Sequence, residues 1–130
     1  MLIDFTEERL PRSRYIKRIT RHKVLAGWYV RALISGMGHG SRIHCEAALY
    51  LYDPEYAWDI TDKKWVKISA SFNGGVYKLQ APGGWLLFST FLQTGAMDTP
   101  SPRTGALVFV PDSNLEWECK IIEEASGIFG

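Results

Sequence analysis

Residues 23–53 constrain the fold more than any other part of the chain, because apolar side chains occupy every second position along two segments. The first segment covers residues 24–34 and the second covers residues 43–51. A period of two is the pattern of a β-strand that is buried on one face. A glycine-rich connection, residues 35–41, separates the segments, so the sequence predicts two long strands joined as a hairpin.

The rest of the chain is divided into short segments by glycine, proline and asparagine. Apolar and polar residues alternate over 66–72, Asn73-Gly74-Gly75 predicts a tight hairpin, and residues 6–10 suggest one helical turn. Further strands are expected at residues 76–81, 85–92, 106–110 and 115–121. No internal repeat is evident. Short strands with this punctuation predict an all-β, single-domain antiparallel β-sandwich, jelly-roll-like, or a barrel.

Positive charge is concentrated at the N-terminus. Residues 1–23 hold seven Lys or Arg and three Asp or Glu, and the remaining residues carry a net negative charge. Basic residues 12–23 fit neither the helical nor the strand period well. We therefore expect a basic N-terminal arm, residues 1–23, ahead of a β-sandwich domain, residues 24–130.

Such an arm would bind phosphate groups electrostatically, with little sequence preference. Its layout is similar to that of some viral coat proteins, in which a basic arm precedes a β-sandwich and contacts the genome. The alternative is a solvated face with Glu7 and Glu8 as local partners. The first hypothesis is thus a non-enzymatic binding or structural module that contacts nucleic acid or an acidic partner. The predicted contact residues are Arg12, Arg14, Lys17, Arg18, Arg21 and Lys23.

Aromatic residues crowd around one turn region and suggest a second hypothesis, a sandwich that binds a carbohydrate or small ligand. Trp65 is predicted on the polar face of its strand and Trp58 precedes a polar turn, so both would be exposed for stacking. The alternative is that these aromatics close the open end of the core. The predicted ligand-binding residues are Gly38, His39, Arg42, His44, Glu46, Trp58 and Trp65.

The segment His39-Gly40-Ser41-Arg42 resembles the His-Gly-Ser/Thr element of ADP-ribosyltransferases. The resemblance implies that His39 would hold the ribose on the nicotinamide side of NAD. The later elements of that family would then be Tyr50 or Tyr52 and Glu116 or Glu118. This is the third and least favoured hypothesis, and no catalytic residue is assigned.

Other cofactor and metal motifs are excluded by their spacing. The glycine-rich connection lacks the Lys-Ser/Thr of a P-loop and the spacing of a dinucleotide fingerprint. His44-Cys45-Glu46 resembles half of the zinc deaminase motif, but the chain has no Pro-Cys-x-x-Cys. We predict no metal and no cofactor.

Cys45 and Cys119 both lie on apolar faces of predicted strands, so we expect buried thiols, and the sequence leaves a bridge between them open. The N-terminus lacks the apolar region of a signal peptide, and no apolar run is long enough to span a membrane. An intracellular protein with no membrane contact is expected. Open sheet edges and many aromatics suggest a homo-oligomer.

Overall fold

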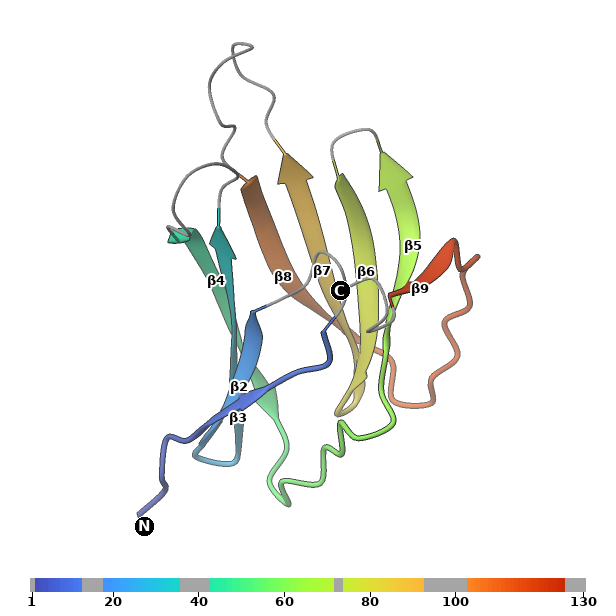
Figure 1. Cartoon of the computed structure of the whole chain (residues 1–130). Coiled ribbons are helices and arrows are strands. Elements are labelled where there is room, and N and C mark those ends of the chain that lie inside the picture. The colour runs from blue at the N-terminus through green and yellow to red at the C-terminus, as the bar shows by residue number, and fades with distance from the viewer. Residues whose placement is uncertain (1, 13–17, 36–42, 72–73, 93–102, 126–130) are drawn as a thin grey trace.

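Two antiparallel sheets make up the described part of the chain, which in this computed structural model is residues 2–12, 18–35, 43–71, 74–92 and 103–125 (Figure 1). The strand order is β1-β2-β3-β4 in the first sheet and β8-β7-β6-β5-β9 in the second. The strands are β1 Glu7–Arg9, β2 Ile19–Val24, β3 Gly27–Ser35, β4 Ile43–Tyr52, β5 Trp65–Ser71, β6 Gly74–Ala81, β7 Gly84–Leu92, β8 Arg103–Pro111 and β9 Glu123–Ala125. The predicted all-β antiparallel fold is confirmed.

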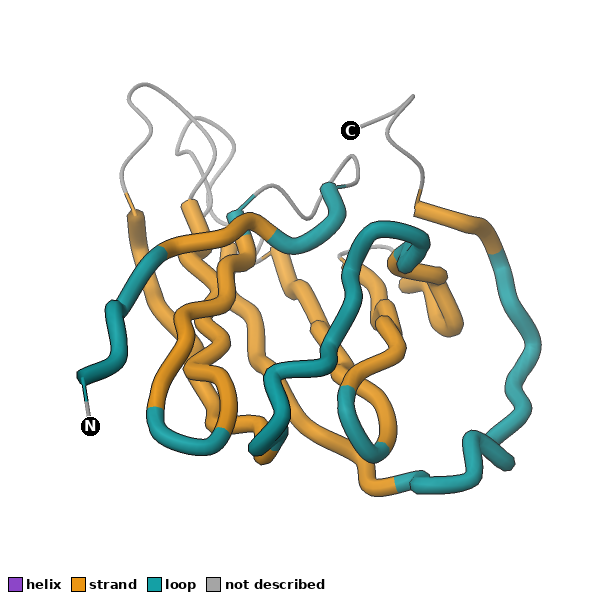
Figure 2. The backbone as a smooth tube through the Cα atoms, turned by 90° about the horizontal axis from the view of Figure 1, so that it is seen from below, coloured by secondary structure: helices purple, strands orange, loops and turns teal. Residues whose placement is uncertain are grey.

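The two sheets meet where β4 lies beside β8, and from this seam they curve around a shared interior. Figure 2 shows the same curvature from below, with the strands arranged around the interior. No strand pairing joins the two sheets within the described ranges, so the barrel is not closed and the arrangement is sandwich-like.

Apolar side chains from both sheets fill this interior. The predicted alternation on β3 is confirmed, because Trp28, Val30 and Ala32 are buried whereas the intervening Tyr29 and Arg31 are only partly buried. The second sheet contributes Trp65, Tyr77, Leu79, Leu86 and Phe88. Each large apolar side chain buried in this way stabilises the fold by about 1.5–3 kcal/mol.

The N-terminal region belongs to the first sheet and is not a separate arm. Residues 7–9 form β1 instead of the predicted helical turn, and β2 lies between β1 and β3. On β2, Ile19 and Arg21 both face the interior and are buried. The division into an arm (residues 1–23) and a sandwich (residues 24–130) is therefore not confirmed. The sequence shows no period of two on β2 because both of its faces are buried, with Thr20 and His22 covered on the face opposite Ile19 and Arg21.

The prediction that Trp65 lies on the polar face of its strand is wrong. Trp65 is fully buried, at 0% exposure, whereas Ala70 on the predicted apolar face is exposed. The cause is a β-bulge, since Ile68 is skipped in the pairing of β5 with β6. A bulge changes the side on which the following residues lie, so the alternation over 66–72 does not extend to the start of the strand.

Residues 19–58 and 76–117, which we name the first unit and the second unit, repeat one local structure although the sequence predicts no repeat. Each contains three consecutive strands, β2-β3-β4 or β6-β7-β8, and ends in a turn that begins with an aspartate. The turn before β3 has Ala26 at φ 57°, and the turn before β7 has Gly83 at φ 75°. Their carbonyls accept hydrogen bonds from the N–H of Asp53 (2.9 Å) and of Asp112 (2.8 Å).

The two aspartate turns agree in their internal hydrogen bonds. Three residues after the aspartate, Tyr56 and Leu115 have φ 50° and 53°, and each N–H donates to the aspartate carbonyl at 3.0 Å. Five residues after it, the N–H groups of Trp58 and Trp117 donate to its Oδ2 at 3.0 and 2.9 Å. One self-contained turn is thus used twice.

The units present these groups to opposite sides of the sheets. The arrowheads of β3 and β7 point the same way in Figure 1, and the strand order is mirrored about the β4–β8 seam. The three strands of the second unit run in the same directions as those of the first but in the reverse order across the sheet. The two units are therefore related by half a turn about the strand axis, which places corresponding side chains on opposite faces. Arg21 and Trp28 of the first unit therefore face the interior, whereas Lys78 and Trp85 of the second unit lie on the face opposite the core residues.

Candidate functional site

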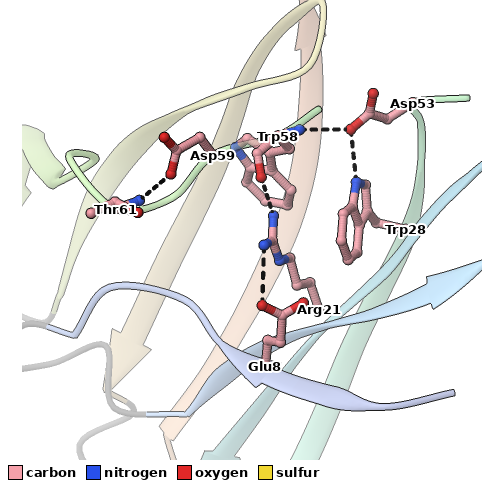
Figure 3. A network of polar contacts seen from close by, with 7 residues as sticks. All are labelled: Glu8, Arg21, Trp28, Asp53, Trp58, Asp59 and Thr61. Carbon is pink, nitrogen blue, oxygen red and sulfur yellow. Dashed lines mark hydrogen bonds and ion pairs between the residues drawn. The ribbon is translucent and has the colours of Figure 1, made fainter. Parts of the chain in front are cut away.

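Arg21 is bound within the fold and is not available to phosphates. Its Nη1 donates to the Trp58 carbonyl at 2.5 Å, and its Nη2 donates to Glu8 Oε2 at 3.2 Å (Figure 3). The guanidinium carbon lies 4.0 Å from the centroid of the Trp28 ring. Arg21 is 7% exposed, and these contacts compensate its buried charge, although its Nε has no hydrogen-bond partner among the described residues.

Asp53 holds the same network from the other side. Its Oδ2 accepts the Trp28 indole N–H at 2.9 Å and the Trp58 backbone N–H at 3.0 Å (Figure 3). The Trp58 indole N–H donates in turn to the Gln80 carbonyl on β6 at 3.0 Å. The loop after β4 is thereby fixed to both sheets.

The six predicted nucleic-acid contacts have different surroundings. Arg12 and Arg18 are exposed, whereas Lys23 is half-buried with its Nζ 4.7 Å from the centroid of the Tyr56 ring. Arg14 and Lys17 lie outside the described residues. Together with the burial of Arg21, this leaves Arg12 and Arg18 as the described members of the set that are open to solvent.

Of the two acids expected to neutralise this region, one pairs with a cation inside it and the other with a cation outside it. Glu7 lies 3.7 Å from Arg31, and Glu8 pairs with Arg21. Exposed Arg9, which was not among the predicted contacts, is like Arg12 and Arg18 in forming no ion pair with any residue that the structure describes. The sequence suggested Glu7 and Glu8 as partners of the basic segment in general, but strand pairing selects which cation each one meets.

The predicted aromatic ligand surface is not formed by Trp58 and Trp65. Both are buried and belong to the core, so the alternative that the aromatics close the interior is confirmed for these two residues. Glu46 is exposed and lies 3.6 Å from Arg31. Gly38, His39 and Arg42 lie outside the described residues, as does the side chain of His44.

The remaining sequence candidates form no described catalytic or metal site. No three His, Cys, Asp or Glu residues gather as metal ligands within the described ranges. Tyr50, one of the residues suggested by the ADP-ribosyltransferase resemblance, donates its hydroxyl to the carbonyls of Leu25 and Ala26. The Cys119 thiol is free and partly buried.

An open pocket of about 320 Å³, which we name the turn-end pocket, lies where the turns of the two units meet. Its polar lining includes Asp53 and Asp59 from the loop after β4, Lys63 farther along that loop, and Gln80 and Ser113 from the second unit. Of the residues that line this pocket, only Trp58 was among the predicted ligand-binding residues. The other residues were not predicted, because they come from separate turns and form no motif.

Comparison of the chain with family models, with curated proteins and with solved structures finds no match. The described residues also include no helix with the length and apolar character that a membrane crossing requires.

Proposed function

We propose that this protein is a non-enzymatic binding module that contacts nucleic-acid phosphates through the connection between β1 and β2. The observation that carries this proposal is the exposure of Arg9, Arg12 and Arg18 without an acidic partner among the described residues. Arginines that are not neutralised attract phosphates and release condensed counterions on binding. The mechanism is electrostatic, as expected for a basic arm, but the contact lies at the connection between two strands of the first sheet.

The position of the three arginines supports a common contact. The Leu10 N–H donates to the Ile19 carbonyl at 2.9 Å, which closes the base of the connection. Arg9 and Arg18 flank this hydrogen bond in the sequence, and Arg12 follows closely. Residues 9–18 contain five Lys or Arg and no Asp or Glu. Because the contact is with the backbone of the nucleic acid, we expect little preference for base sequence.

The test is fluorescence anisotropy with labelled single-stranded and duplex oligonucleotides, measured over a series of salt concentrations. We expect the logarithm of the binding constant to fall linearly with the logarithm of the salt concentration. The double variant Arg12→Glu/Arg18→Glu should bind more weakly. The negative slope of the binding constant against salt, on logarithmic scales, should become less steep by about 2.

The matched control is Lys64→Glu/Lys120→Glu, which changes the net charge equally at two other exposed positions. This control should retain the slope of the unmodified chain. Equal losses in the two double variants would mean that affinity follows net charge and not the connection. Absence of oligonucleotide binding at low salt would reject the proposal and direct attention to an acidic protein partner.

A further inference from the structure

The turn-end pocket is lined by Asp53, whose carboxylate has one oxygen without a donor among the described residues. Asp53 is 6% exposed, and its Oδ2 takes both hydrogen bonds from the tryptophans. Its Oδ1 accepts no hydrogen bond from the described residues and points away from Trp28 (Figure 3). A carboxylate oxygen that no protein group donates to can accept a hydrogen bond from a ligand. The pocket is the open space beside Asp53 from which such a donor can come.

The other polar groups of the pocket both donate and accept. Asp59 accepts the Thr61 N–H at 2.9 Å, and hydrogen bonds from Thr61 lower the pKa of Asp59, so it is ionised at neutral pH. Lys63 supplies an ammonium donor, the Gln80 amide supplies both functions, and Ser113 supplies a hydroxyl.

This combination discriminates between classes of ligand. Two carboxylates disfavour phosphate and other anions. Lys63 offsets one of the two negative charges, and the described residues hold no group of three side chains that could bind a metal ion. Hydroxyl groups donate and accept at the same time, so they suit a lining of carboxylate, amide and ammonium. A volume of about 320 Å³ lies at the lower end of the roughly 300–1,000 Å³ typical of small-molecule sites.

The walls of the pocket are fixed before any ligand arrives. The Trp58 indole is bonded to the Gln80 carbonyl, and Asp53 is held by two donors. On the opposite side, Asp112 N–H donates to the Gly83 carbonyl at 2.8 Å, which holds the turn before β7. A preorganised site loses little conformational entropy when it binds.

We propose that the turn-end pocket binds a small, neutral, polyhydroxylated ligand of monosaccharide size. Its hydroxyl groups donate to Asp53 Oδ1 and Asp59 and accept from Lys63 and the Gln80 amide. The site is separate from the β1–β2 connection and does not depend on nucleic-acid binding.

The experiment is an NMR titration of the full chain with D-glucose, D-galactose, N-acetyl-D-glucosamine and myo-inositol, each to roughly 10 mM, which covers a Kd of about 1 mM. The Trp58 indole N–H resonance is the reporter, and the backbone N–H of Val30, which is buried in the middle of β3 and does not line the pocket, is the internal reference. We expect at least one compound to shift Trp58 in a saturable manner and to leave Val30 unchanged. Inorganic phosphate should shift neither.

Gln80→Ala and Asp59→Asn should each weaken binding of that compound about tenfold, because they remove or neutralise a hydrogen-bonding group without changing a buried contact. Asp62→Asn is the matched control, since Asp62 is exposed in the same loop and does not line the pocket. Three outcomes would overturn the proposal: no saturable Trp58 shift with any of the four compounds, equal binding by all variants, or tighter binding of phosphate than of the polyols.

Discussion

The first and second units build the same arrangement of aspartate, two tryptophans and a cation, but one faces the interior and the other the outer face of the second sheet. The matching groups are Asp53, Trp28, Trp58 and Arg21 in the first unit, and Asp112, Trp85, Trp117 and Lys78 in the second. The cation meets the tryptophan at the start of the next strand in the same way, since Arg21 Cζ lies 4.0 Å from the centroid of Trp28 and Lys78 Nζ lies 4.0 Å from that of Trp85.

The difference lies in how the cation is satisfied. Arg21 donates to a backbone carbonyl and to Glu8, the residue opposite it on β1. Lys78 lies opposite Val66 on β5, and its ammonium makes cation–π contacts with Trp85 and Trp117 but no ion pair within the described residues. A guanidinium offers several donors in a fixed plane, which suits the interior, whereas an ammonium needs fewer fixed partners. The aspartate turn therefore keeps the same hydrogen bonds on either face of a sheet, whereas the cation beside it differs with the partners available on that face.

Removing the aspartates should give the largest difference in stability between variants of the first unit and variants of the second unit. Asp53→Ala leaves two buried N–H donors without an acceptor, and we expect it to lower the free energy of unfolding by about 3–5 kcal/mol. Asp112→Ala should cost clearly less, because water can replace the carboxylate on the outer face. Urea unfolding of both variants is the measurement, and equal losses would show that burial does not distinguish the units.

The second prediction concerns the glycine at the start of β3 and of β7, where a substitution should destabilise both units equally. A methyl group on Gly27 would meet the Leu51 carbonyl, and one on Gly84 would meet the Val110 carbonyl. Gly27→Ala and Gly84→Ala should therefore each destabilise the protein by about 2–3 kcal/mol, the cost of forcing two packed strands apart. Thermal unfolding tests this, and a loss confined to one variant would contradict the structural equivalence of the units.

The third prediction separates the two cations. Arg21→Met leaves the Trp58 carbonyl without its donor and should lower the free energy of unfolding by about 2 kcal/mol. Lys78 is as buried as Arg21, at 6% exposure, but Lys78→Met removes cation–π contacts and leaves no hydrogen-bonding group unpaired, so it should cost less than Arg21→Met. The pair can be compared by urea unfolding at neutral pH. A larger loss for Lys78→Met would mean that the outer arrangement carries more stability than its contacts indicate.

The smallest expected effect is a dependence of stability on pH that arises from Asp112 in the second unit. Hydrogen bonds from the backbone of Trp117 and Glu116 and from the Trp85 indole lower the pKa of Asp112, with a contribution from Lys78. A lowered pKa in the folded state stabilises the protein above the ordinary carboxyl pKa, and this contribution disappears as the pH falls through the folded value. The urea midpoint should thus fall less between about pH 5 and about pH 2 in Asp112→Asn than in the unmodified chain. An unchanged pH profile would contradict this assignment.

The sequence predicts the all-β fold because the period of two survives on β3, where Trp28, Val30 and Ala32 are buried. It fails on β2 because both faces of this strand are buried, and three of the four buried residues, Thr20, Arg21 and His22, are polar. It also fails at Trp65, because a bulge depends on the pairing with β6 and leaves no mark in the alternation.

The repeat and the turn-end pocket were missed for a related reason. The units share few letters, chiefly Gly-Trp at the start of β3 and β7 and an aspartate five residues before Trp58 and Trp117. Their agreement lies in φ angles and backbone hydrogen bonds, which many sequences can satisfy. The pocket arises only when the turns of both units come together.

Both sheets end on strands of three residues, β1 and β9, and each begins with two glutamates. An edge of three residues offers few backbone hydrogen bonds to an added strand, and short edge strands are one way in which proteins resist aggregation. β1 and β9 therefore limit unwanted β-pairing with neighbouring chains at these two edges in a crowded solution.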